Sequence, residues 1–165
     1  GNEGNFGTFE SQQNHPVPAL IEKITNSVDA TLIKDCKING IDPKSHEAPR
    51  SMNEAVEKFY NVKDGEIGEL TNKERRELAE NIQIIATGEK IQPCITIYDA
   101  GEGQIPEEFE DTFLSLQNNN KTSIHFVQGK YNMGSTGAVV FCGDKKYQLI
   151  ALNLIREKIV SLVSH

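Results

Sequence analysis

Long hydrophobic runs are absent from this chain of 165 residues. One of its longest apolar runs, GAVVFC at 137–142, is far shorter than the ~20 residues that a membrane-spanning helix needs. Near the N-terminus, no basic stretch precedes an apolar one as in a secretion signal. We therefore expect a cytoplasmic protein without a membrane partner.

Cysteine and positive charge are both scarce. The three cysteines, Cys36, Cys94 and Cys142, show no CxxC spacing, which argues against a disulfide framework or a zinc site and favours buried thiols. Lysine and arginine number 17 against 24 acidic residues, and the net charge is -7. Because duplex binding needs clustered cations, we expect no direct nucleic-acid binding from this chain.

The length suits one domain, spanning 1–165, with a single hydrophobic core. Residues 1–15 are rich in Gly and Asn without periodicity, which predicts a flexible arm. A helix is predicted from Pro16 to about residue 36, with a core-facing stripe of Ile21, Ile24, Val28 and Leu32. The segment 41–90 is predicted to be a helical insertion.

Two S/T-x-x-E spacings inside that insertion, at Ser51 and Thr71, predict helix starts with capping boxes. The second of these helices is expected to end at Gly88, with an apolar stripe of Leu78, Ile82 and Ile85.

The remaining elements follow from alternation and breaker residues. PCITIYDAG at 93–101 predicts a strand that ends at Asp99, and Pro106 is expected to open a helix. Residues 117–129 are predicted to form a polar, flexible connection, and 145–155 the final strand.

The predicted first helix carries a second stripe, made of Glu22, Asn26 and Asp29. At about 100° per residue, these three side chains fall within about 60° of each other. Considered alone, such a stripe is more often a solvated helix face than a site.

Two glycine-containing segments change that balance. A strand-end carboxylate such as Asp99 can accept a hydrogen bond from an exocyclic amine, and Gly101 and Gly103 let backbone approach a flat ring. The same DAGEG letters also fit a simple tight turn. The glycine-rich stretch 129–137 precedes an apolar segment. Glycine-rich backbone that leads into a helix N-terminus can bind polyphosphate, but the same stretch also fits a simple surface loop.

Taken in order, the three segments resemble the motifs of the GHKL ATPase superfamily of gyrase, the large heat-shock chaperone, histidine kinases and MutL. EKITNSVDA is similar to the N box, DAGEG to the G1 box and GKYNMGSTG to the G2 box. The resemblance covers residues 16–34 and 91–152. It implies an α/β (α+β) two-layer sandwich of the Bergerat type, with helices on one face of a mixed sheet that is cut short at the C-terminal strands.

By this resemblance, Glu22 is the general base that activates water, and Asn26 is the ligand of Mg²⁺. The other nucleotide-binding residues that it implies are Asp29, Asp99, Gly101, Gly103, Lys121, Gly129, Gly134 and Gly137. Histidine kinases of the superfamily usually lack the glutamate, so Glu22 favours hydrolysis over phosphate transfer to a protein.

The function implied is slow hydrolysis of Mg-ATP, with ATP and ADP as ligands, in the nucleotide switch of a larger protein. Dimerisation or a domain partner would accompany it. Asn132 replaces an expected glycine, and no threonine follows Thr136. These departures keep an alternative open, namely a non-catalytic nucleotide-sensing or protein-interaction module.

Overall fold

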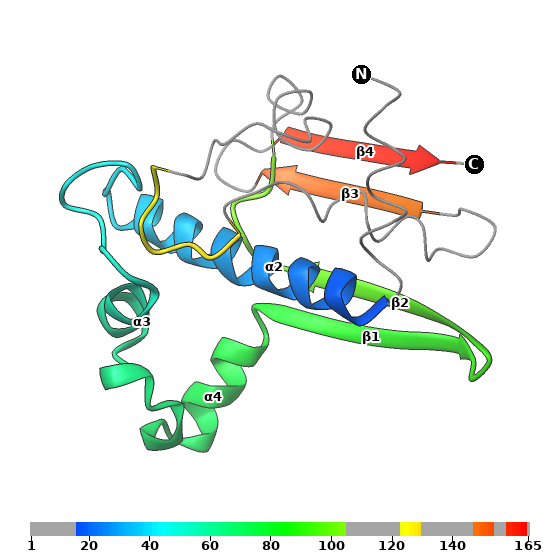
Figure 1. The fold of residues 1–165 in the computed structure, drawn as a ribbon, viewed down its shortest axis with the longest axis horizontal. Coiled ribbons are helices and arrows are strands. Elements are labelled where there is room, and N and C mark those ends of the chain that lie inside the picture. Colours follow the sequence, from blue (N-terminus) through cyan, green and yellow to red (C-terminus); the bar gives the residue numbers. More distant parts are fainter. Residues whose placement is uncertain (1–15, 105–122, 130–146, 154–157, 165) are drawn as a thin grey trace.

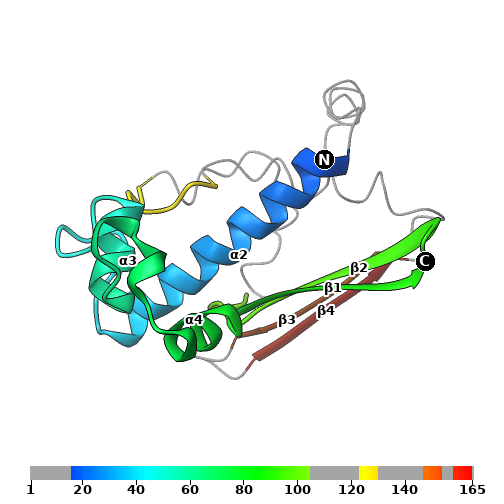
Figure 2. The same cartoon turned by 90° about the horizontal axis from the view of Figure 1, so that it is seen from below.

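The computed structural model describes residues 16–104, 123–129, 147–153 and 158–164. These residues form an α+β structure in which helix α2 lies over two β-hairpins (Figures 1 and 2). The α-helices are α2 (Pro16–Ile38), α3 (Met52–Tyr60) and α4 (Asn72–Ala79), and two short 3₁₀ turns, η1 (Lys63–Gly65) and η2 (Ile67–Glu69), connect α3 to α4. The strands are β1 (Ile82–Glu89), β2 (Gln92–Asp99), β3 (Tyr147–Asn153) and β4 (Lys158–Ser164).

The described strands pair only in antiparallel fashion, β1 with β2 and β3 with β4. The presence of both α-helices and β-strands confirms the coarse α+β class. The described strands form two separate two-stranded sheets, and no parallel pair of a mixed sheet occurs among them. Figure 2 shows both hairpins on the same side of α2.

Helix α2 begins at Pro16 as predicted and continues to Ile38, slightly past the predicted end. Proline suits the first turn because its missing N–H has no partner there in any case. The predicted apolar stripe is correct only toward the C-terminal end: Leu32 is 1% exposed, whereas Ile21 is 56% exposed. Ile21, at the N-terminal end of this stripe, therefore does not face the core.

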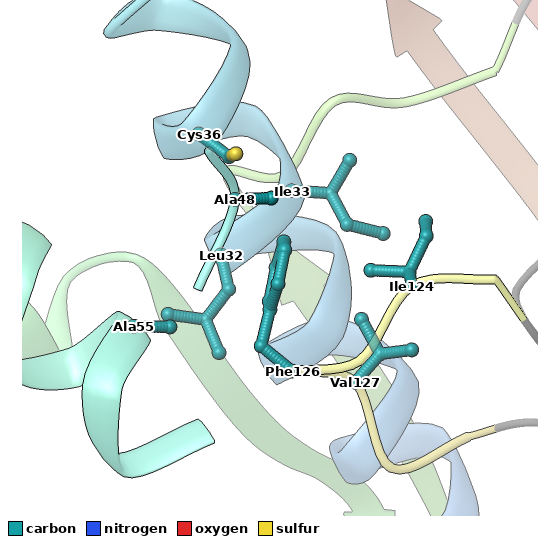
Figure 3. Packing of buried hydrophobic residues seen from close by; sticks show 8 residues of the cluster. All are labelled: Leu32, Ile33, Cys36, Ala48, Ala55, Ile124, Phe126 and Val127. Carbon is teal, nitrogen blue, oxygen red and sulfur yellow. The ribbon is translucent and has the colours of Figure 1, made fainter. Parts of the chain in front are cut away.

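The core forms where the C-terminal half of α2 meets α3 and the segment 123–129 (Figure 3). Its buried apolar members are Leu32, Ile33, Cys36, Ala48, Ala55, Ile124, Phe126 and Val127. The prediction of a polar connection is therefore wrong for 123–129, because three of its side chains pack into the core. Among the residues that the structure describes, Phe126 is the largest fully buried side chain.

Both predicted helix starts are present, with different caps. The Thr71 hydroxyl accepts from the Glu74 N–H at 3.3 Å, and the Glu74 carboxylate accepts from the Thr71 hydroxyl and N–H. These hydrogen bonds hold the pKa of Glu74 below its usual range. At α3, Ser51 caps Glu54 in the same way, but the Glu54 carboxylate accepts from the N–H of Arg50 and leaves the box incomplete.

The predicted helix from Thr71 to Gly88 is wrong beyond Ala79. Residues 82–89 form strand β1, which pairs with β2 in a register that joins Ile82 to Asp99 and Glu89 to Gln92. Isoleucines favour a strand. Pairing with β1 also gives hydrogen-bond partners to the backbone groups of β2, which a continued helix over 82–89 would not provide. Part of the predicted helical insertion thus belongs to a hairpin.

The strand predicted to end at Asp99 is confirmed as β2. The strand predicted within 145–155 is confirmed as β3, but it is not the final strand, because β4 follows it. The predicted arm 1–15 and the helix predicted from Pro106 lie outside the described residues.

Among the cysteines, Cys36 is buried as expected, whereas Cys94 on β2 is exposed. The expectation of buried thiols is therefore wrong for Cys94. In the described part of the chain, no helix is both long and apolar enough to cross a membrane.

Candidate functional site

Helix α2 presents different residues on its two flanks near its middle. At about 100° per residue, Ser27 and Asp29 point about 160° apart, and Asn26 falls in the arc between them. Ser27 contacts the end of β2, and Asp29 contacts the segment that ends at Gly129. The helix thereby contacts both Asp99, at the end of β2, and Gly129, the first residue of the glycine-rich stretch and the one residue of it that the structure describes.

The Asp99 carboxylate is held by one donor on each oxygen. The Ser27 hydroxyl donates to Oδ2 at 2.9 Å, and the Gly101 N–H donates to Oδ1 at 3.0 Å. The side chain is half-buried, and each oxygen retains a lone-pair site after these bonds. This carboxylate therefore has a fixed orientation and can accept a further hydrogen bond from a ligand.

Gly101 is required by its contact with α2. A Cβ at this position would lie 2.5 Å from the Cβ of Ala30 and 3.0 Å from its carbonyl carbon. The N–H of Glu102 also donates to the Ala30 carbonyl at 3.3 Å. The first glycine of DAGEG thus allows the turn to pack on the helix, and Gly103 has a positive φ of 65°, which favours glycine.

Asp29 is completely buried on the other flank. Its two carboxylate oxygens accept from the N–H groups of Gln128 (3.0 Å) and Gly129 (2.8 Å). A Cβ on Gly129 would lie 2.5 Å from the Asn26 amide oxygen. A solvated helix face is therefore excluded for Asp29, which anchors the beginning of the glycine-rich stretch.

Glu22 and Asn26 are half-buried on the N-terminal half of α2. Their side chains make no hydrogen bond or ion pair to any described residue. A carboxylate and an amide one helical turn apart are free to bind water, a cation or a polar ligand. No cluster of three or more His, Cys, Asp or Glu able to hold a metal ion occurs among the residues that the structure describes.

Sequence reasoning missed Ser27, Lys34 and the anchoring role of Gln128. The sequence did offer a signal for Ser27, because helix geometry places its hydroxyl about 100° from Asn26 and so beside the same polar stripe. Its partner proved to be Asp99 at the end of β2. Nothing in the letters shows that Lys34 reaches the carbonyl of Ala100, since that contact depends on the tertiary packing. The predicted residues Lys121, Gly134 and Gly137 lie outside the described part.

A cavity of about 220 Å³ lies away from this region, next to η1, η2 and α4. It is lined by Asn61, Val62, Lys63, Glu66, Glu69, Leu70 and Glu74. It includes none of the residues predicted for nucleotide binding.

No family model, curated protein or solved structure matches this chain.

Proposed function

We propose that this chain is a Bergerat-type ATP-binding domain of the GHKL kind, which binds Mg-ATP and hydrolyses it slowly as the switch of a larger protein. The proposal is supported by the contacts that α2, which carries the first motif-like segment, makes with Asp99 of the second segment and with Gly129, the first residue of the third. The segments are separated by up to 100 positions in the sequence, as in the bond from Gly129 to Asp29. If the sequence patterns matched by chance, these segments would have no reason to be in contact.

The orientation of Asp99 is the single observation that carries the proposal. An ionised carboxylate can only accept hydrogen bonds, and the exocyclic amine of adenine is a donor. Because Ser27 and Gly101 fix both oxygens, the acceptor is pre-organised before a ligand arrives. Pre-organisation reduces the ordering cost of binding and favours adenine over bases that present a carbonyl at the same position.

Asn26 suits a magnesium ion that arrives with phosphate oxygens and water. Mg²⁺ prefers oxygen ligands and commonly uses few protein groups beside a nucleotide, so one amide oxygen is a sufficient protein contribution. The ion would supply charge neutralisation to the phosphates. Glu22, one turn away and half-buried, would hold and deprotonate the attacking water.

The beginning of the glycine-rich stretch is placed by Asp29, which binds two consecutive backbone N–H groups. This puts Gly129 against Asn26, so phosphates bound by the following glycines would lie near the proposed magnesium ligand. A switch role follows if ATP binds one arrangement of this stretch better than another, because only such a difference can shift a conformational equilibrium.

The test is calorimetry with ATP, with and without Mg²⁺, followed by measurement of phosphate release. Asp99→Asn should weaken ATP binding by about tenfold or more, because an amide nitrogen replaces one acceptor. Asp64→Asn, on exposed η1, removes the same charge away from the site and should leave the affinity unchanged. Equal affinities of the two variants would contradict the placement of the adenine.

Glu22→Ala should retain binding and lose turnover, whereas Glu57→Gln, on an exposed position of α3, should retain both. Phosphate release that is the same with and without Glu22 would remove this residue from the mechanism. Binding by the wild type without any turnover would support the alternative of a nucleotide-sensing module, and no binding at all would leave an interaction module.

A further inference from the structure

Two lysines on one side of α2 hold the turn that follows Asp99. The Lys34 ammonium donates to the carbonyl of Ala100, and Lys37 forms an ion pair with Glu102. They are spaced by three positions and therefore lie on neighbouring turns of the helix. Neither residue belongs to the motif-like segments as a ligand-binding position.

The Ala100 carbonyl and the Gly101 N–H belong to the same planar peptide unit. One end of this unit accepts from Lys34, and the other end donates to Asp99 Oδ1 at 3.0 Å. Fixing the carbonyl therefore fixes the direction of the N–H. A cation at the carbonyl also polarises the unit and strengthens the hydrogen bond at its other end.

This peptide unit needs such a restraint because a glycine follows it. Contact with Ala30 excludes any side chain at Gly101, but a glycine lets the preceding peptide rotate at little steric cost. A rotated peptide would point its carbonyl oxygen at the Asp99 carboxylate in place of the N–H. The close packing of the turn and the freedom of its backbone thus arise from the same residue.

We propose that Lys34 is a positioning residue for Asp99, acting through the Ala100–Gly101 peptide that it holds in one orientation. The inference deepens the proposed function, because it assigns the geometry of the adenine acceptor to a lysine outside the motifs. Lys37 has a smaller role, since its ion pair with Glu102 is exposed (45% and 24% for the two side chains) and such pairs contribute little.

The first test needs no nucleotide. Amide hydrogen exchange at Gly101 is compared between the wild type, Lys34→Met and the matched Lys37→Met, which removes a lysine one turn along the same helix. Exchange should be about tenfold faster in Lys34→Met and within about twofold of wild type in Lys37→Met. Lys34→Gln provides the same comparison if Lys34→Met does not fold.

Unchanged exchange without Lys34 would overturn the proposal, and so would equal acceleration in both variants, since this would indicate general loosening of the turn. Lys34→Arg keeps the cation and should restore slow exchange. A wild-type rate in Lys34→Arg with a fast rate in Lys34→Met supports positioning by charge-assisted hydrogen bonding.

The second test measures the Kd for ATP. Lys34→Met should weaken binding about tenfold, which corresponds to about 1.4 kcal/mol, and Lys34→Arg should recover most of this loss. If the wild type binds no ATP, the proposed function fails while the exchange measurement still decides the positioning role. If the wild type binds and Lys34→Met binds equally well, the positioning role fails while the proposed function stands.

Discussion

Gly101 approaches α2 so closely that no side chain fits between the turn and the helix. We predict that Gly101→Ala lowers the free energy of unfolding by about 1–3 kcal/mol, the usual cost of overpacking, because its Cβ would meet both side-chain and backbone atoms of Ala30. Gly68→Ala is the matched control, since a Cβ there has no atom within 4 Å. Urea denaturation of both variants checks this, and equal midpoints would mean that the turn does not pack on α2 as described.

The two described cysteines should differ sharply in reactivity. Burial raises the pKa of the Cys36 thiol and shields it from reagents, whereas Cys94 is exposed on β2. Iodoacetamide at mildly alkaline pH should therefore modify Cys94 in the native protein and Cys36 only after unfolding. Peptide mapping of the alkylated sites gives the answer, and native labelling of Cys36 at the rate of Cys94 would contradict the packing of the core.

Part of the candidate site could be predicted from individual letters. The spacing of Glu22, Asn26 and Asp29 correctly placed them on one side of a helix, but it could not show that only Asp29 is buried. Burial depends on the segment 123–129, whose N–H groups satisfy that carboxylate from about a hundred residues away. Gly101 was singled out for its freedom to approach a ligand, whereas the structure shows it in contact with the helix.

Helices α2 and α3 are joined by a hydrogen bond from the Tyr60 hydroxyl to Asp35 at 2.7 Å. Burial raises the pKa of Tyr60 well above its usual value, and the bond to the Asp35 carboxylate raises it further. The protonated phenol is therefore the form that the folded state stabilises. This gives the link between the helices a definite dependence on pH.

We predict that Tyr60→Phe costs about 1.5–3 kcal/mol at neutral pH, as is typical for a hydrogen bond to a charged group. The contribution of Tyr60 is complete below the pKa of an unfolded tyrosine, about 10, and declines as the pH rises above it, because the unfolded phenol then ionises while the folded one resists. The stability difference between wild type and Tyr60→Phe should therefore shrink in alkaline solution. Denaturant titrations at several pH values measure it, and a constant difference would show that the phenol is not held as described.

The elements with a single clear pattern were predicted well, and those with two patterns were not. The strand that ends at Asp99 alternates and is stopped by glycine, and α2 begins at a proline and has helical periodicity. By contrast, Leu78, Ile82 and Ile85 are spaced three and four apart, which fits a helix, although the last two are isoleucines that also suit a strand. Pairing with β2 decides between these patterns, and pairing is a tertiary fact that local sequence does not contain.

The predicted insertion 41–90 is not a separable unit. Ala48 and Ala55 pack in the same core as α2 and Phe126, and β1 pairs along the full length of the strand that ends at Asp99. In contrast, η1, η2 and α4 contain no buried residue. The segment thus has two parts. Ala48, α3 and β1 pack or pair with the rest of the molecule, whereas η1, η2 and α4 border the cavity lined by Glu66, Glu69 and Glu74 and bury no residue of their own.

Helices α3 and α4 offer a matched test of this division, since they have 9 and 8 residues and both lie inside 41–90. Replacing α3 by a Gly/Ser stretch of equal length should abolish cooperative unfolding. The core would lose Ala55 and the partly buried Met52, Val56 and Phe59 that pack against it, and large losses from a core typically cost about 2–5 kcal/mol per side chain. The same replacement of α4 should leave a cooperative transition at slightly lower stability. Calorimetric melting distinguishes them, and a cooperative transition without α3 would show that this helix is an addition to a core that is complete without it.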